Sequence, residues 1–350
     1  MPEVQIVVTG GAGFIGSHLV EELLRVRAGA SPFQHLFEPI GSFRIVVVDN
    51  FTTGRPENLE DVRSTVAREG MDPTFELIQG SVQEPGLLEG LFDEHTYVLH
   101  QGAIPSVMRS VKDPLATHEN NVTGTLVLLE AARKRRVRRV VLASSSSVYG
   151  DTPTLPKRED MPPSPLSPYA ISKLAGEYYA RVYHSLFGVE TVSLRYFNIF
   201  GPRQDPTSQY SAVIPRFIHQ ILEGQPVTIF GDGLQSRDFT YVKNAVFANF
   251  LALFAPQAAG EVFNISTGQR HTLLELVDLL EEILGVQDHP RAFLDPRPGD
   301  IRHSLGDIQK ARRLLGYEPL MGFREGLEAT VAWFRERWQP SQSTGSTEAG

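Results

Sequence analysis

The 350-residue sequence contains no cysteine and no long apolar segment. Without cysteine the chain can form no disulfide, and it has no thiolate nucleophile or thiolate metal ligand. No apolar stretch approaches the ~20 residues that a membrane span needs. A strand-like run begins at the third or fourth residue, which leaves no room for a signal peptide. These absences lead us to expect a soluble, cytoplasmic protein without a metal site or a membrane partner.

The charge of the chain is moderate and acidic. The composition is 41% hydrophobic and 21% charged, with a formal net charge of −8, which is ordinary for a globular protein and weighs against a nucleic-acid partner. One basic run, ARKRRVRRV at 132–140, is an exception. It falls where a predicted helix ends and cations complement the helix dipole, and we interpret it as a solvated helix end.

Short β-branched runs alternate with amphipathic segments through the first half of the chain. The predicted strands are VQIVVTG (4–10), FRIVVVDN (43–50), TFELIQG (74–80), YVLHQGA (97–103), RRVVLASSS (138–146) and ETVSLRYFN (190–198). SHLVEELLRV (17–26) and VTGTLVLLEAARK (122–134) carry apolar residues at helical spacing. Strands that are apolar throughout are typical of a parallel sheet buried on both faces. The predicted fold class is therefore α/β: a Rossmann-type, doubly wound parallel sheet with a smaller α/β C-terminal lobe.

Proline and glycine divide the second half into shorter pieces, for example at FGPRQDP (200–206), with helical patterns at 272–285 and 325–338. The predicted division of the chain is a nucleotide-binding domain at 1–195 with a return segment near 238–260, a second lobe that comprises mainly 196–338, and a polar, disordered tail at 339–350.

A glycine-rich turn joins the first predicted strand to the first predicted helix. In VVTGGAGFIGSHLVEELL, Gly11, Gly13 and Gly16 fit the G-x-G-x-x-G spacing, and Gly10 adds a further glycine. Such a turn lets the backbone approach a pyrophosphate, which then meets the exposed N–H groups and the dipole of the helix. A glycine motif alone is weak evidence, but its place between strand and helix favours a dinucleotide cofactor.

An aspartate ends the second predicted strand. A carboxylate at Asp49 would bind the adenosine ribose hydroxyls and repel a 2′-phosphate, so we predict NAD rather than NADP. Asp49 follows Gly16 at a greater distance than the ~20 residues usual in such folds. We interpret the stretch AGASPFQHLFEPIG (28–41) as an inserted loop before the second strand.

Tyr169 and Lys173 stand four residues apart in SPYAISK, a spacing that places both on one helix face. A lysine ammonium beside a phenol favours the phenolate and lowers the pKa of the phenol from ~10. We therefore expect Tyr169 to be a general base that takes a proton from an alcohol whose carbon loses a hydride. The pair supports this interpretation because it follows a dinucleotide motif and a serine-rich strand end.

Several ordered segments give the chain a resemblance to a known group of enzymes. They are TGGAGFIG, DNFTTG, HQGA, NNVTGT, SSSSVYG, YAISK, RYFNIFGPRQ, GDGLQSRDF and RPGDIRHS, and the resemblance extends from about residue 4 to residue 338. With them the sequence resembles the extended short-chain dehydrogenase/reductase superfamily, and within it the nucleotide-sugar 4-epimerases. The resemblance implies tightly held NAD, oxidation of the C4 hydroxyl of a UDP-sugar, and return of the hydride to the other face of a 4-keto sugar.

The same resemblance implies roles within the serine run at 144–147. The family's catalytic hydroxyl lies four residues before the tyrosine of VYG, which corresponds to Ser145. It would hydrogen-bond the sugar O4 and relay its proton to Tyr169. Ser146 and Ser147 stand where related 4,6-dehydratases carry an Asp-Glu pair and decarboxylases typically carry a glutamate. Two serine hydroxyls cannot act as that acid–base pair at neutral pH, which favours epimerisation without elimination of water. Ser144 would then only cap the strand end.

Further site residues follow from the resemblance by position. Around the cofactor it implies Gly10, Gly11, Gly13, Phe14, Ile15, Gly16, Asp49, Asn50, Gly54, Ser81, Val82, Gln101, Ala103, Asn121, Tyr169, Lys173 and Tyr196. Around the substrate it implies Ser106, Ser145, Ser146, Asn198, Ala212, Val213, Phe217, Arg237, Arg297, Asp300 and Ser304. The arginines suit a diphosphate, because a guanidinium is permanently charged and donates in pairs.

Two positions depart from the family pattern. An aspartate near adenine usually follows the glycine after the third strand, but here Ser81 occupies its place in GSVQE. Pro105 stands where close relatives often have glycine beside the substrate-binding Ser106. Because proline lacks an N–H group and fixes φ, we expect local contacts to the sugar to differ.

The resemblance also suggests a substrate and an assembly. Ser304 is small, which implies room for a 2-acetamido group, so the expected substrates are UDP-N-acetylglucosamine and UDP-N-acetylgalactosamine, with UDP-glucose and UDP-galactose as a further pair. Helices predicted at 114–134 and 167–188 match those through which many relatives dimerise, so we expect a two-fold symmetric homodimer.

Two alternatives stay open. The first is another nucleotide-sugar enzyme of the same superfamily, such as a uronate epimerase, decarboxylase or reductase. The second is a non-catalytic NAD-binding scaffold, a class that usually loses the Tyr–Lys pair. Tyr169 and Lys173 are both retained here, which disfavours a scaffold.

Overall fold

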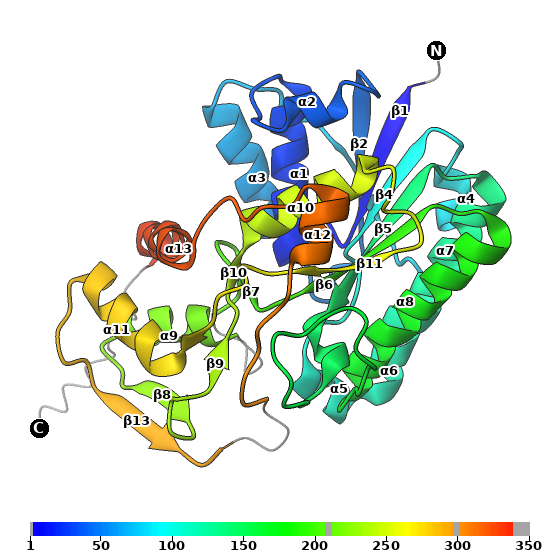
Figure 1. Ribbon diagram of the computed structural model, residues 1–350. Coiled ribbons are helices and arrows are strands. Elements are labelled where there is room, and N and C mark those ends of the chain that lie inside the picture. The colour runs from blue at the N-terminus through cyan, green and yellow to red at the C-terminus, as the bar shows by residue number, and fades with distance from the viewer. Residues whose placement is uncertain (1–2, 207–211, 297–300, 339–350) are drawn as a thin grey trace, which may run out of the picture.

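A parallel sheet of seven strands forms the centre of the larger lobe (Figure 1). The structure is a computed structural model, and it describes residues 3–206, 212–296 and 301–338. The strand order is β11-β6-β5-β4-β1-β2-β3, and all neighbouring pairs are parallel. The chain winds outward from β1 through β2 and β3, then returns to β4 and winds the other way. This is the doubly wound, Rossmann-type arrangement that the sequence predicts.

The sheet confirms the six predicted strands and adds a seventh. Its strands are β1 (Val4–Thr9), β2 (Phe43–Asp49), β3 (Glu76–Gln79), β4 (Thr96–His100), β5 (Arg139–Ser145), β6 (Thr191–Tyr196) and β11 (Val262–Ile265). The strand β11 was missed because it is short and Asn264 interrupts its apolar run. It pairs with β6, so a segment far along the chain completes the sheet.

Helices cover both faces of this sheet. On one face lie α1 (Phe14–Arg27), α3 (Pro56–Arg68), α10 (Val242–Phe254) and α12 (Gln309–Leu315). On the other lie α4 (Leu87–Leu91), α7 (Gly124–Arg135) and α8 (Pro168–Phe187), with α5 (Val107–Lys112), α6 (Pro114–His118) and a π-helical turn (Glu119–Thr123) beside α8. Ile6 of β1 faces the first group and the adjacent Val7 faces the second. Burial on both faces explains why the strands are apolar at consecutive positions.

The predicted insertion at 28–41 packs against the sheet's helices. It carries α2 (Gln34–Phe37), whose Phe37 is buried. The ring of Phe37 lies 5.0 Å from that of Phe250 and 5.1 Å from that of Phe254, centre to centre. The insertion therefore extends the hydrophobic core over α10.

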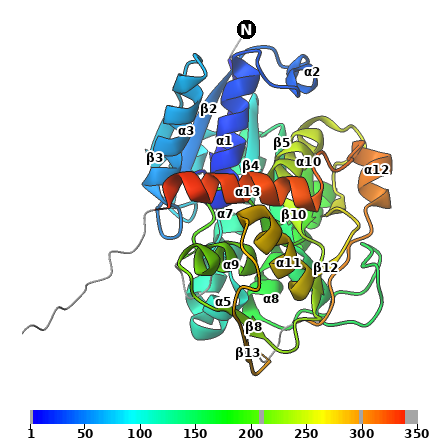
Figure 2. The ribbon, with the colours of Figure 1, turned by 90° about the vertical axis from the view of Figure 1, so that its left-hand side faces the viewer.

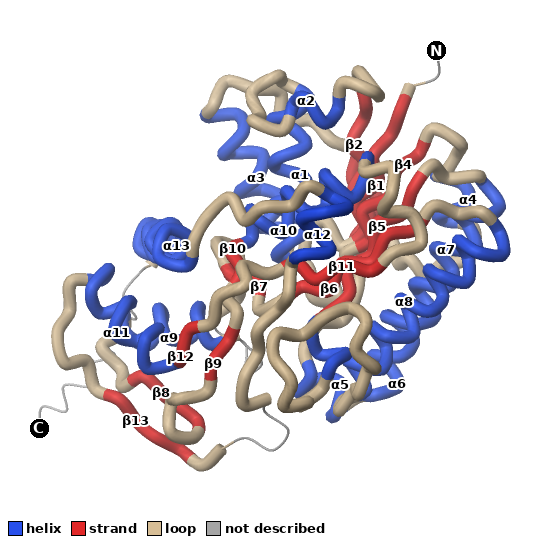
Figure 3. The backbone as a smooth tube through the Cα atoms, viewed as in Figure 1, coloured by secondary structure: helices blue, strands red, loops and turns tan. Residues whose placement is uncertain are grey.

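A smaller lobe of short strands and helices lies beside the sheet (Figure 3). Its elements are β7 (Ile199–Phe200), α9 (Val213–Leu222), β8 (Val227–Phe230), β9 (Ser236–Arg237), β10 (Thr240–Tyr241), β12 (His271–Thr272), α11 (Leu273–Leu284), β13 (Arg291–Leu294) and α13 (Phe323–Arg337). Figure 2 shows α13 lying across the junction between the two lobes. Its Arg337 pairs with Asp61 of α3. Within the described ranges, no helix combines the length and the apolar character needed to cross a membrane.

Candidate active site

A cavity of about 760 Å³ opens at the carboxyl ends of the central strands. The strands reverse their winding direction between β1 and β4, and doubly wound sheets bind ligands at such a crevice. The structure brings to this cavity the predicted residues Gly10, Gly13, Phe14, Ile15, Gly16, Asp49, Asn50, Gly54, Val82, Gln101, Ala103, Ser106, Ser145, Ser146, Tyr169, Lys173, Tyr196, Asn198, Ala212, Arg237 and Ser304.

The glycine turn after β1 has no room for side chains. Gly10 has a φ of +69°, and a Cβ there would lie 2.7 Å from the backbone nitrogen of Gly102. A Cβ on Gly11 would lie 2.6 Å from a methyl carbon of Val47, so Gly11 packs on β2 and does not line the cavity. The helix α1 begins after Gly13 without a side-chain cap, which leaves its first N–H groups for a ligand. A diphosphate fits such a helix start.

Asp49, at the end of β2, presents a buried carboxylate beside this turn. Its Oδ2 accepts a hydrogen bond from the Ala12 N–H at 2.9 Å, and its Oδ1 accepts one from the Phe51 N–H at 2.8 Å. Burial raises the pKa of Asp49, and these hydrogen bonds offset only part of that rise. A Cβ on Gly54 would lie 2.7 Å from both carboxylate oxygens. The carboxylate is thus fixed in the cavity, where it suits the hydroxyls of a ribose.

Tyr169, Ser145 and Lys173 meet in the same cavity. Ser145 ends β5, and Tyr169 lies in the first turn of α8, which the Ser167 side chain caps. The side chains of Ser145 and Tyr169 share a hydrogen bond. One turn further, the Nζ of Lys173 donates to the carbonyl oxygen of Ala143 at 2.9 Å. The three side chains thus lie together in the cavity that the glycine turn also lines.

The structure corrects the predicted ionisation of Tyr169. Burial raises the pKa of Tyr169, the hydrogen bond with Ser145 offsets only part of that rise, and Lys173 does not lower it. Burial also lowers the pKa of Lys173 to about 8. Folding removes both groups from water, and this desolvation outweighs the effect that the charge of Lys173 would have on the phenol.

The four serines of ASSSSVYG differ in their contacts. Ser144 is buried and donates to the carboxylate of Glu177 at 2.5 Å, so it does not cap the strand end as predicted. Ser145 provides the cap, because its oxygen accepts from the Ser147 N–H at 3.2 Å. Ser146 and Ser147 line the cavity in a 3₁₀ turn (Ser146–Tyr149).

Asn121 supports the site from behind the cavity wall. It lies in the π-helical turn and is buried. Its amide oxygen accepts from the Ile104 N–H at 2.7 Å, and its amide nitrogen donates to the Ser172 hydroxyl at 3.0 Å. Asn121 therefore braces the loop after β4 against α8.

The two departures from the family pattern have different surroundings. Ser81 accepts from the Gln83 N–H at 3.2 Å and does not line the cavity. Pro105 and Ser106 both line it. Ser106 has a φ of +103°, and its side chain accepts from the Arg109 N–H to cap α5. A non-glycine residue in this conformation is strained, and such strain concentrates at binding sites.

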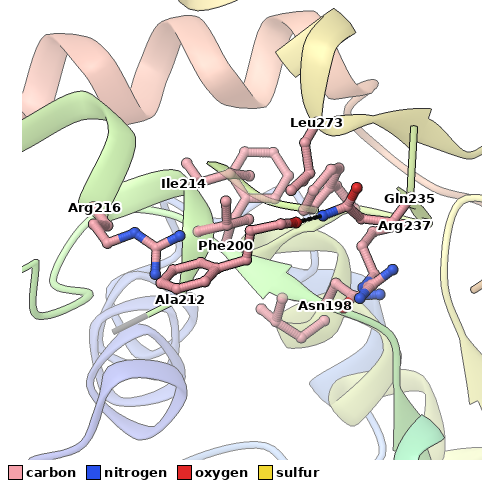
Figure 4. Close-up of a pocket in the computed structure, with 12 residues that line it drawn as sticks. Asn198, Phe200, Ala212, Ile214, Arg216, Gln235, Arg237 and Leu273 are labelled. Atoms are coloured by element: carbon pink, nitrogen blue, oxygen red, sulfur yellow. Dashed lines mark hydrogen bonds between the residues drawn. The ribbon is translucent and has the colours of Figure 1, made fainter. Parts of the chain in front are cut away.

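A second cavity of about 260 Å³ extends into the smaller lobe (Figure 4). It shares Asn198, Ala212 and Arg237 with the larger cavity, and Val213 also lines it. The amide nitrogen of Gln235 donates to a backbone carbonyl at 2.5 Å. Its Oε1 is buried and has no hydrogen-bond partner among the described residues, so it is available to accept from a ligand.

Among the predicted substrate residues that the structure describes, Phe217 lines neither cavity. Phe217 is fully buried in the core of the smaller lobe, because α9 turns it together with Ile221 towards α11 and α13. Arg297 and Asp300 lie outside the described residues. Ser304 does line the larger cavity, and the Asn198 amide nitrogen lies 3.4 Å from its hydroxyl.

The sequence analysis missed several polar residues of the cavity walls, among them Arg109, Arg203, Arg216 and Gln235. The motifs GPRQ and GDGLQSRDF, which carry part of the family resemblance, include Arg203 and Gln235, so both residues could have been predicted from the sequence. Arg109 and Arg216 stand on helices whose rotation relative to the cavity cannot be predicted from the sequence pattern.

Comparisons with known proteins agree with this geometry. Residues 6–266 match the profile of the NAD dependent epimerase/dehydratase family. The chain is 37% identical over 339 residues to a UDP-glucose 4-epimerase of Mycolicibacterium smegmatis, an alignment that covers 96% of this chain and 100% of that protein.

Two solved structures are similar over almost the whole chain. The UDP-N-acetylglucosamine 4-epimerase from Methanobrevibacter ruminantium M1, in complex with UDP-N-acetylmuramic acid, has a TM-score of 0.84 and 36% identity, covering 97% of this chain and 100% of that one. The UDP-glucuronic acid 4-epimerase from Bacillus cereus, in complex with UDP-glucuronic acid and NAD, has a TM-score of 0.82 and 34% identity, covering 96% and 100%.

Proposed function

The chain belongs to the NAD dependent epimerase/dehydratase family, and from this premise we propose that it is a UDP-sugar 4-epimerase acting mainly on UDP-N-acetylglucosamine and UDP-N-acetylgalactosamine. One observation carries the proposal. Ser145, Tyr169 and Lys173 meet in the cavity that also contains the glycine turn and Asp49. A general base beside a dinucleotide site suits the reversible oxidation of an alcohol.

The residues around the glycine turn fit NAD, the cofactor of the family. The first N–H groups of α1 would hold its diphosphate, and the Asp49 carboxylate would hold the adenosine ribose hydroxyls. A 2′-phosphate would meet the same carboxylate and be repelled. When bound, NAD supplies the acceptor and the donor of the C4 hydride.

Tyr169 is proposed to move the proton. As a phenolate it would accept the proton of the C4 hydroxyl, with Ser145 as the hydrogen-bonding relay, while the C4 hydride leaves. After the 4-keto sugar has turned, the hydride returns to the other face of C4 and the phenol returns the proton to O4. Burial raises the pKa of Tyr169, so the phenolate needs positive charge nearby. The positive nicotinamide ring of oxidised NAD, when bound, would provide it.

The two adjoining cavities suit the two parts of a UDP-sugar. Arg237 lines both and would bind the diphosphate. The unpartnered Oε1 of Gln235 would accept from the uracil or the ribose in the smaller cavity. Ser304, on the wall of the larger cavity, leaves room for an acetamido group. Ser146 and Ser147 offer no carboxyl group for the elimination of water, which supports epimerisation.

Product analysis tests the proposal. Purified protein is incubated with UDP-N-acetylglucosamine, UDP-glucose, UDP-glucuronic acid and a dTDP-hexose, and the products are resolved by NMR and mass spectrometry. We expect C4 epimers of unchanged mass, with the acetylated sugar turned over at least as well as the plain hexose. Loss of water or carbon dioxide would contradict the proposal, and turnover of the uronate alone would replace it with uronate epimerisation. Bound NAD without any turnover would indicate a scaffold.

We also propose that two copies pair through α6 and α8. Large apolar side chains stand exposed on these two helices: Leu115, Ile171, Tyr178, Val182, Leu186 and Phe187. A two-fold related copy would cover them with the same helices. Light scattering at micromolar concentration should give the mass of a dimer, and Leu186→Glu should shift it towards the monomer. A monomeric mass for the unaltered protein would refute the pairing.

A further inference from the structure

Three consecutive residues at the end of β5 are each held by a different residue of α8. The carbonyl oxygen of Ala143 accepts from Lys173, Ser144 donates to Glu177, and Ser145 shares a hydrogen bond with Tyr169. Tyr169, Lys173 and Glu177 are spaced four apart, so they lie along one face of the helix. Two of these contacts involve the proposed acid–base residues, whereas Glu177 has no part in the proposed chemistry.

Arg195 fixes the carboxylate of Glu177 in turn. Its Nε and Nη2 donate to the two carboxylate oxygens at 2.8 Å and 2.7 Å. The side chains of Arg195 and Glu177 are only 5% and 2% exposed. Arg195 lies on β6 directly opposite Ser144 in the sheet register. The carboxylate is therefore bonded to both β5 and β6.

The network continues beneath the serine turn. The guanidinium carbon of Arg195 lies 4.7 Å from the centre of the Tyr149 ring. The Tyr149 hydroxyl donates to the Asn264 amide oxygen on β11 at 2.7 Å. One ion pair thus connects α8 to β5 and β6 and packs against the turn that carries Ser146 and Ser147.

The stability of the fold does not explain why this charged pair is buried. Taking both charges out of water costs about as much as their attraction returns, and apolar side chains of the same size often replace a buried pair without loss. The two parallel hydrogen bonds of the pair are directional, however, and they fix the Glu177 carboxylate of α8 against Arg195 of β6, where Ser144 of β5 donates to it. On the premise of the proposed epimerase function, we propose that Glu177 and Arg195, through Ser144, are positioning residues that hold Tyr169 against Ser145.

Two changes test this without leaving a charge unpaired. Ser144→Ala removes the hydrogen bond from β5 to Glu177 of α8, and the double variant Glu177→Leu/Arg195→Met removes both charges at once. We expect each to lower kcat by roughly tenfold to a hundredfold, the scale of a small misplacement of reacting groups. The KM for the UDP-sugar and the content of bound NAD should stay near those of the unaltered protein.

The opposite end of β5 provides a matched control. Arg139 and Glu190 form an ion pair there, with the Arg139 Nε and Nη2 at 2.8 Å and 2.6 Å from one Glu190 oxygen, and the Glu190 side chain is 47% exposed. Arg139→Met/Glu190→Leu should alter the unfolding midpoint and leave kcat unchanged. An equal loss of kcat in this control would assign the effect to general destabilisation and overturn the proposal.

Combination with Tyr169→Phe separates positioning from a merely structural role. If Ser144 acts through Tyr169, adding Ser144→Ala to Tyr169→Phe should cost little further kcat. Full additivity of the two losses of kcat would overturn the proposal.

A readout independent of turnover is the pKa of the Tyr169 phenol, which is measured by NMR titration of ¹³C-labelled tyrosine and assigned with Tyr169→Phe. The pKa of Tyr169 should rise in Ser144→Ala, because the displaced phenol loses its hydrogen bond with Ser145, which lowers that pKa. An unchanged pKa of Tyr169 would contradict the proposal. An unaltered protein without epimerase activity would refute the proposed function, and the titration would still decide the positioning.

Discussion

The Nζ of Lys173 lies 5.9 Å from the centre of the Tyr169 ring and donates its hydrogen bond to the Ala143 carbonyl oxygen. Both residues leave water on folding, and burial lowers the pKa of Lys173 from 10.5 to about 8. The unfolded chain therefore binds more protons than the folded protein between these two pH values. Stability contributed by this residue rises with pH across that window.

Lys173→Met removes this dependence, because methionine has a similar length and no charge. Below pH 8 the variant should be the more stable protein, since it buries no ammonium. The difference should shrink as pH rises from 8 towards 10.5. Urea unfolding of both proteins at pH 7.5 and 9.5 measures it. A difference that stays constant, or grows with pH, would show that Lys173 is not buried in its charged form.

Tyr169→Phe should lower kcat by roughly 10²–10⁴-fold, the usual contribution of a general acid–base group. The ring is kept and only the hydroxyl is lost, so the dissociation constant of the UDP-sugar should stay near its original value. Ser145→Ala should act in the same direction and more mildly. Initial rates and isothermal titration check both. Near-normal turnover by Tyr169→Phe would mean that another residue is the base.

Gly54→Ala should weaken NAD binding by roughly tenfold or more. The added methyl group would lie 2.7 Å from both Asp49 oxygens, and such overpacking costs about 1–3 kcal/mol. Gly90→Ala is the control, because nothing lies within 4 Å of the added carbon. Nucleotide released on denaturation is quantified for each protein. We expect NAD(H) from the unaltered protein and the control, and recovery of NADP would contradict the role of Asp49.

Phe37→Ala should reduce the free energy of unfolding by about 3–5 kcal/mol, as expected when a buried aromatic ring is removed. The insertion would lose its contact with α10, whereas the cavity lies elsewhere, so KM should not change. Phe293→Ala is the comparison, because Phe293 is 54% exposed and its loss should change stability little. Similar losses in both variants would mean that the insertion does not pack as described.

Ser304→Tyr should close the space for the acetamido group. Ser304 is 8% exposed and lies at the cavity wall beside Asn198, so a tyrosine ring has little room to turn aside. A cost of about 1–3 kcal/mol on the reaction corresponds to roughly a tenfold to hundredfold loss. The ratio of kcat/KM for acetylated and plain substrates should fall by that factor. If the unaltered protein accepts only UDP-glucose and UDP-galactose, Ser304 does not provide space for the acetamido group. Pro105, which also lines the cavity, would then be the first residue to test for narrowing it.

The fold was largely predictable because the strands of a doubly wound sheet are buried on both faces and stand out as apolar runs. The glycine turn and Asp49 were equally accessible, since each follows such a run directly. The strand β11 was not predicted, because four residues that include Asn264 form no clear apolar pattern. Domain limits and residue roles stay predictions.

Side-chain direction and ionisation were harder to predict. Phe217 was expected at the substrate, but the rotation of α9 places it in the core. The pKa of Tyr169 depends on desolvation, which a sequence does not report. Glu177 could be recognised as continuing the four-residue spacing of Tyr169 and Lys173, but its partner Arg195 lies on another strand and becomes visible only in the folded chain.

The central claim is that C4 loses its hydride and receives the same hydride back. UDP-N-acetylglucosamine that carries deuterium at C4 tests this directly when it is converted in ordinary water and the product is examined by NMR and mass spectrometry. We predict UDP-N-acetylgalactosamine with the deuterium still at C4 and the mass unchanged. Deuterium lost to water, or found on another carbon of a lighter product, would contradict the account.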